Sequence, residues 1–193
     1  MALRVNALMS MAAPVLVASG ALLGAPQLLW IVTVASCLAG GVALAGLRTD
    51  AARGRVIVAL SLTTQVILLT AALHGSPLQA DMHMVFFAVL ASIATFTSRA
   101  GLVAASGLIA GHHLGATLLA PDLVFNTSDL SFNLMRTGFL TLVLALTTAC
   151  LLLIVYVRLS QTTAAQRHAE RLEAAMAEAQ QALALAEAQR QEA

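Results

Sequence analysis

The sequence is poor in charge and in cysteine, and each shortage excludes a class of protein. Asp, Glu, Lys and Arg make up only 10% of the 193 residues, too few for an ordinary soluble domain. The two cysteines, Cys37 and Cys150, lie in separate apolar stretches, so no disulfide framework is expected. A net charge of +1 gives no electrostatic footprint for nucleic acid. There is no phosphate-binding loop, nucleophile elbow or pair of catalytic carboxylates, so we expect no enzyme activity from this chain.

Apolar residues are abundant instead, at 60% of the chain. They form stretches long enough to cross a bilayer, of which the fourth is short. The sequence therefore predicts an all-α fold, a polytopic six-helix transmembrane bundle over residues 1–158, with spans at Val5–Leu23, Leu28–Leu47, Val56–His74, Met82–Phe96, Gly101–Leu119 and Leu134–Val157. Inside the third span, Gln65 is expected to bridge helices by hydrogen bonds.

Basic residues fix the predicted orientation. If six spans alternate, all arginines flanking them fall on one side, and the opposite loops contain no Lys or Arg. By the positive-inside rule, that arginine-rich side is cytoplasmic and both termini lie in the cytoplasm. The arginines concerned are Arg4, Arg48, Arg53, Arg55, Arg99 and Arg158.

Four of the five histidines fall at one level of this bundle. Counting about 1.5 Å per residue from the cytoplasmic arginines places His112 and His113 at about 20 Å, His83 at about 24 Å and His74 at about 28 Å. Asp81 comes out at about 27 Å by the same count. Ionisable residues are costly in hydrocarbon and usually mark a function there. We therefore predict a site in the outer part of the membrane, open toward the periplasm or the cell exterior.

The histidines do not all carry this prediction equally. His74 and Asp81 lie at helix ends, where polar residues collect and an aspartate caps the following helix. His112 and His113 lie well inside the fifth span, and a membrane helix has little reason for two adjacent imidazoles unless at least one binds something. Adjacent residues point about 100° apart, so one is free to ligate while the other hydrogen-bonds a neighbour.

The residue types indicate several cofactors. Imidazoles bind copper, zinc and iron, and the thioether of Met84 beside His83 favours copper, although methionine is also a common apolar filler. Two histidines on different helices also suit haem b. A haem pocket needs small and aromatic residues, and Phe86, Phe87, Gly107, Gly111 and Gly115 are compatible with one. The predicted metal ligands are His83, His112, His113 and His74, with Asp81 and Met84 in support.

Two separated motifs resemble a known family. Asp81-Met82-His83-Met84-Val85-Phe86-Phe87 is an acidic-x-His-x-x-Phe segment, and Gly111-His112-His113-Leu114 followed by Pro121-Asp122-Leu123-Val124-Phe125 comes later. The region from Val56 to Arg158 resembles a multi-helix membrane module found before chemoreceptor, histidine kinase and diguanylate cyclase domains of bacterial signalling proteins. The resemblance implies a sensor in the bacterial inner membrane that passes a signal to a cytoplasmic output.

The chain departs from that family pattern in two places. The turn between the motif helices is Thr97-Ser98-Arg99-Ala100, where relatives often have tryptophan and arginine. Relatives also tend to have a histidine early in the last membrane helix, where this chain has Asn133 and Arg136. These two residues point either to a different ligand set or to an anionic ligand beside Arg136.

The segment 159–193 predicts a cytoplasmic coiled-coil signalling helix. Small or apolar residues recur at intervals of three and four, in a seam continuous with the last membrane helix. Such a seam predicts a parallel homodimer, although an Ala- and Glu-rich tail is also compatible with a lone solvated helix. The pattern continues to Ala193 without a cap, so we expect an output domain or an output protein beyond it. The central seam residues are Ala169, Leu172, Met176, Ala179 and Leu183.

These features together predict a membrane sensor that relays the state of a histidine site through the coil. Two other classes stay open. The histidines of a metal-free receptor would bind a small polar molecule, a quinone or protons. A small membrane carrier or scaffold would use the coil only for assembly.

Overall fold

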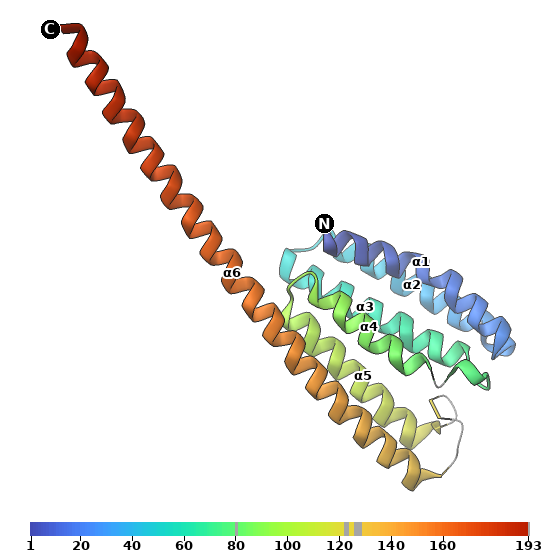
Figure 1. The fold of residues 1–193 in the computed structure, drawn as a ribbon. Helices are drawn as coiled ribbons and strands as arrows, with labels where there is room; N and C mark the ends of the chain where they lie inside the picture. Colours follow the sequence, from blue (N-terminus) through green and yellow to red (C-terminus); the bar gives the residue numbers. More distant parts are fainter. Residues whose placement is uncertain (80, 122–123, 126–128, 193) are drawn as a thin grey trace. The chain divides into compact units, whose positions relative to one another are not determined.

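The computed structural model describes residues 1–79, 81–121, 124–125 and 129–192, with the side chains of 183–188 and 191–192 excepted. Within these residues the chain is helical, with no β-strand. The elements, in chain order, are α1 (Ala2–Leu23), η1 (Pro26–Leu28), α2 (Leu29–Gly46), α3 (Ala51–Ala72), η2 (Pro77–Gln79), α4 (Met82–Ala94), α5 (Arg99–Leu119) and α6 (Leu130–Glu192) (Figure 1). The all-α prediction is confirmed.

Six helical segments of the described chain are long and apolar enough to cross a membrane. They coincide with the predicted spans, and most ends agree within a few residues. The fourth is the shortest, as predicted: α4 has 13 residues, and only with η2 does the segment Pro77–Ala94 reach 18. At about 1.5 Å per residue, α4 alone is too short for a hydrocarbon core of about 30 Å.

The chain divides into two compact units, Met1–Val155 and Tyr156–Ala193. The first contains α1 to α5 and the N-terminal part of α6. The second is helical through Glu192, and its described side chains are mostly exposed, including Leu172 and Met176 of the predicted dimer seam. Ala169 and Ala179 are exposed as well. The side chain of Leu183 lies outside the described residues.

Helices α1, α2 and α3 pack against one another around a polar network centred on Gln65. The Gln65 amide donates to the carbonyl oxygens of Ser10, at 2.8 Å, and Ser36, at 2.9 Å. The Ser36 hydroxyl donates to the Gln65 side-chain oxygen, and the hydroxyls of Ser10 and Ser61 lie 2.9 Å apart. Gln65 thus bridges three helices, which confirms the prediction of a hydrogen-bonding rather than a ligand-binding role.

Glycine allows the close approach of α2 and α3. A Cβ on Gly54 would lie 2.5 Å from the carbonyl oxygen of Gly46, a distance at which the backbones would have to move apart. Gly41, by contrast, has open space around its missing Cβ. The contact at Gly54 therefore lets the backbones of α2 and α3 lie close together.

A tight turn places α5 beside α4. Thr97 adopts a left-handed backbone conformation with φ of 52°, and the Ser98 hydroxyl accepts a hydrogen bond of 3.0 Å from the Gly101 amide at the start of α5. The Ser98 cap satisfies one of the free amides of the helix N-terminus. With a turn this short the two helices run antiparallel, so the first turn of α4 lies next to the last turns of α5 (Figure 1).

Candidate functional site

Three of the predicted histidines form one cluster of rings. His83 comes from the start of α4, and His112 and His113 come from the C-terminal half of α5. The ring centroids of His83 and His113 are 5.2 Å apart, and those of His112 and His113 are 5.4 Å apart. Phe86, one helical turn after His83, packs its ring edge to face with His113 at 5.2 Å. We refer to His83, His112 and His113 as the histidine layer.

His113 is the most buried of the three, with 4% of its surface exposed. Its Nδ1 lies 2.8 Å from the carbonyl oxygen of Ile109. A carbonyl oxygen can only accept, so Nδ1 carries the proton and Nε2 of the neutral ring keeps its lone pair. Metal-bound histidines commonly donate their second ring nitrogen to a backbone carbonyl in this way. His113 is therefore held in the tautomer that a ligand at Nε2 requires.

His112 is half-buried, and its Nε2 atom is buried without a hydrogen-bond partner among the described residues. A buried polar nitrogen without a partner loses its hydration and gains nothing in return, which destabilises the fold unless something binds there. The adjacent imidazoles therefore differ: His113 is hydrogen-bonded within its helix through Nδ1, whereas Nε2 of His112 has no partner among the described residues.

The remaining predicted ligands come from other positions of the chain. His74 lies in the turn after α3. Asp81 is exposed at the N-cap position of α4 and makes no side-chain capping hydrogen bond there. Met84 is 71% exposed, as a lipid-facing methionine would be.

The described residues include no group of three or more His, Cys, Asp or Glu side chains already arranged to hold a metal ion. A shared ion would therefore require the three imidazoles to rotate toward one point. Of the residues compatible with a haem pocket, Phe86 contacts the rings of His112 and His113, and Phe87 lines a small cavity against His113. Gly107, Gly111 and Gly115 each face open space.

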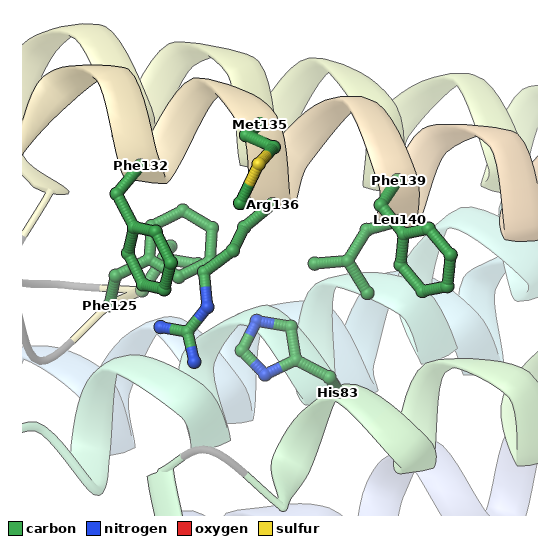
Figure 2. A pocket seen from close by; sticks show the side chains of 8 residues that line it. His83, Phe125, Phe132, Met135, Arg136, Phe139 and Leu140 are labelled. Carbon is green, nitrogen blue, oxygen red and sulfur yellow. The ribbon is translucent and has the colours of Figure 1, made fainter.

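A pocket of about 620 Å³ opens beside His83. Its volume is within the range of about 300 to 1,000 Å³ that is usual for small-molecule sites. Its walls come from α4, the segment before α6 and the outer turns of α6, all within the first unit. Figure 2 shows the imidazole of His83 and the guanidinium of Arg136 turned toward each other from opposite sides. The lining residues are His83, Val124, Phe125, Phe132, Met135, Arg136, Phe139 and Leu140.

Aromatic rings hold both polar side chains of this pocket. The ring of Phe125 stacks on His83 with centroids 5.9 Å apart and planes 13° from parallel. The guanidinium carbon of Arg136 lies 4.8 Å from the centroid of Phe132 and 5.8 Å from that of Phe125. Such cation–π contacts stabilise a guanidinium by roughly 0.5–2 kcal/mol. These contacts hold the exposed side chain of Arg136 beside the pocket.

Hydroxyl groups join α5 to α6 on either side of the histidine layer along α5. The Thr117 hydroxyl donates to the His113 carbonyl at 2.6 Å and lies 2.7 Å from the Thr137 hydroxyl. Because Thr117 has used its single proton, Thr137 is the donor of the second bond. A similar pair joins Ser106 and Thr148 at 2.7 Å. The backbone of α5 at His113 is therefore linked to α6 by hydrogen bonds.

Asn133 and Arg136 take different places on α6. Asn133 is fully buried, whereas Arg136 lines the pocket. From the sequence, both residues were grouped with the site, but no role was given to Phe125, Phe132 and Phe139, which make the pocket aromatic. Phe125 ends the second motif of the resemblance, and Phe132, Arg136 and Phe139 recur at helical spacing on one face.

Comparisons of the chain with known protein families, with curated proteins and with solved structures found no match.

Proposed function

We propose that this chain is a transmembrane sensor module in which the histidine layer binds a metal ion. The observation that carries the proposal is the meeting of His83, His112 and His113, with the lone pair of His113 Nε2 fixed by the bond to Ile109. Imidazoles in a membrane helix are costly and are kept where they bind or relay something. The sensor role itself rests on the sequence, through the resemblance and the predicted coil.

Copper is the ion that we propose first. With Met84 exposed, the ligand set is imidazole nitrogen, for which copper has the highest affinity among the first-row divalent ions. Zinc, and haem iron held by two of the histidines, are the alternatives that the same nitrogens suit. When bound, the metal supplies a charge that draws the neutral imidazoles together. His113 needs no change of tautomer for this, and His112 gains a partner for its buried Nε2.

The signal would leave the site through α6. A metal drives a conformational switch only if it binds the two states with different affinity. Here one state would have the three imidazole rings drawn together, and the other would have them apart. A shift of the α5 backbone at His113, as the rings are drawn together, would act on the Thr117–Thr137 bond and so on α6. We infer that segment 159–193 of two chains pairs as a parallel coil and passes the change to a cytoplasmic output, in the inner membrane of a bacterium.

Copper binding by single variants tests the proposal. Equilibrium dialysis of the tag-free protein against Cu²⁺ should give close to one saturable site per chain. His113→Ala and His83→Ala should lose that site. His168→Ala is the matched control, because His168 is an exposed histidine of the second unit. Equal copper retention by all three variants would overturn the metal assignment.

A second candidate function is a metal-free receptor, and the pocket beside His83 favours it. The pocket is of ligand size and places a guanidinium and an imidazole together in apolar surroundings. Under this alternative the pocket ligand, rather than a metal, moves α4 against α6. A ligand-dependent change in coil cross-linking that persists in metal-stripped protein would support the receptor.

A further inference from the structure

We propose that the pocket beside His83 binds an organic anion with an apolar body, whose anionic group pairs with Arg136. The inference deepens the receptor alternative and rests on it for any role in signalling. Binding itself requires neither a metal nor an output domain.

The positive charge of Arg136 has no partner of opposite charge among the described residues. Among the described residues, the ion pair found is the exposed one between Arg53 and Asp50 on the opposite side of the bundle, and none involves Arg136. Arg136 is exposed on α6, a helix apolar enough to cross a membrane, and a guanidinium that faces hydrocarbon is costly without a counter-charge. The rings of Phe132 and Phe125 offset part of that cost but carry no negative charge. An anion in the pocket supplies the missing partner.

The shape of the Arg136 guanidinium suits a carboxylate. A planar guanidinium matches a carboxylate through two parallel hydrogen bonds, and such charge-assisted bonds are roughly twice as strong as neutral ones. The imidazole of His83 lines the same pocket, is turned toward Arg136 (Figure 2) and stacks on Phe125. The two groups therefore converge on one end of a ligand.

The rest of the pocket wall, away from Arg136 and His83, is apolar. Val124, Phe125, Phe139 and Leu140 surround the rest of the volume. A small inorganic anion would leave most of the 620 Å³ unfilled, whereas an aromatic or aliphatic body would fill it and bury apolar surface. The ligand class is thus an amphipathic organic acid.

Two sources supply this chemistry: a soluble organic acid and the anionic headgroup of a membrane lipid. The lipid source must be tested because Phe132, Met135 and Phe139 are 43%, 64% and 67% exposed, so the pocket opens on the apolar surface of α6. Both sources use Arg136 in the same way.

The test compares two probes with the same body and different charge, 2-naphthoate and 2-naphthylmethanol. The full chain, in nanodiscs of zwitterionic phosphatidylcholine, is titrated by calorimetry, with empty nanodiscs as the blank. We expect saturable binding of naphthoate, at least about tenfold tighter than binding of the neutral alcohol, as the loss of a charge-assisted pair predicts.

Variants locate the binding. Arg136→Gln should weaken naphthoate binding by about tenfold or more and leave the weak binding of the alcohol unchanged. Arg158→Gln is the matched control, because it removes an arginine of the same helix outside the first unit and should not change either affinity. Equal affinity for acid and alcohol, or equal naphthoate affinity in wild type and Arg136→Gln, would overturn the proposal.

The lipid arm replaces part of the phosphatidylcholine with phosphatidylglycerol. If a lipid headgroup is the anion, phosphatidylglycerol should compete with naphthoate, and native mass spectrometry should show it retained by the wild type but not by Arg136→Gln. If the source is soluble, naphthoate affinity should be the same in both lipids. Binding of neither naphthoate nor phosphatidylglycerol would overturn the anion site.

Ligand binding and coil cross-linking are measured separately, so a failure of the anion site can be told from a failure of the receptor function. Binding that depends on Arg136 while coil cross-linking stays unchanged would confirm the anion site and contradict the receptor. Coil cross-linking that responds to copper without naphthoate binding would contradict the anion site and leave the metal sensor standing.

Discussion

The imidazole rings of His83 and His113 meet with their centroids 5.2 Å apart and their planes inclined at 51°. They come from the start of α4 and the last turns of α5, which the turn at Thr97 and Ser98 folds back side by side. The contact makes His83 common to the two proposed sites, because the same side chain lines the pocket that contains Arg136. An occupant of either site would therefore act on the other through one imidazole.

Replacing Gln65 should destabilise the first three helices. Gln65→Ala removes the donor to the carbonyls of Ser10 and Ser36 and leaves the Ser36 hydroxyl without its acceptor. Side-chain hydrogen bonds between membrane helices contribute about 0.6 kcal/mol on average and up to about 1.7, so we expect a total loss of about 1–3 kcal/mol. Thermal unfolding in detergent measures it. Gln161→Ala, in the exposed tail, should leave the melting temperature unchanged, and an equal effect of both variants would contradict the role of the network.

Close helix packing at Gly54 gives a matched pair of glycine variants. Gly54→Ala puts a methyl group 2.5 Å from the backbone oxygen of Gly46, so α2 and α3 must separate, and we expect a loss of about 1–3 kcal/mol. Gly41→Ala, with open space at that position, should be neutral or stabilise by up to about 1 kcal/mol through helix propensity. Opposite shifts of the melting temperature are the expected result. A stabilised Gly54→Ala would show that the two helices are not in contact there.

The hydroxyl tie between α5 and α6 predicts an uncoupled variant. Thr137→Val keeps the shape of the side chain but removes the proton donated to Thr117, while the bond from Thr117 to the His113 carbonyl remains. We expect copper binding close to that of the wild type and a reduced copper-dependent change in coil cross-linking. Thr64→Val removes only a bond within α3 and is the control. An unchanged response in Thr137→Val would exclude this route for the signal.

Segment 159–193 predicts a pattern of cross-links. In a background with Cys37 and Cys150 replaced by alanine, a cysteine substituted at Met176 should form an intermolecular disulfide readily, because that position lies in the predicted seam. Glu173→Cys lies off the seam and should react more slowly. Non-reducing electrophoresis after mild oxidation compares the two rates. Equal rates would favour a lone helix over a parallel dimer.

The six apolar helices were predictable from sequence because hydropathy and length decide whether a segment can span a bilayer. The histidine layer was predictable for a related reason. Counting helical rise from the arginines at one end of the spans gives the height of a residue, and His83, His112 and His113 came out at similar heights. Their ring contacts agree with that estimate.

What could not be predicted was the rotation of each helix about its own axis. Met84 follows His83 directly, yet a step of about 100° turns it to the exposed surface while His83 faces α5. Because the rotation of α6 about its axis was unknown, the contact of Arg136 with Phe125 and Phe132 could not be predicted either. Height along a helix follows from the sequence, but direction depends on packing between helices, which a single sequence does not specify.

Metal analysis with an absorption spectrum, on protein purified without a histidine tag or chelator, tests the metal site most directly. The account predicts close to one copper per chain, which is lost in His113→Ala and retained in His168→Ala. A haem Soret band would keep the histidine site and change its cofactor. Protein without metal or chromophore, even after reloading, would contradict the metal sensor and leave the pocket at Arg136 as the site to study.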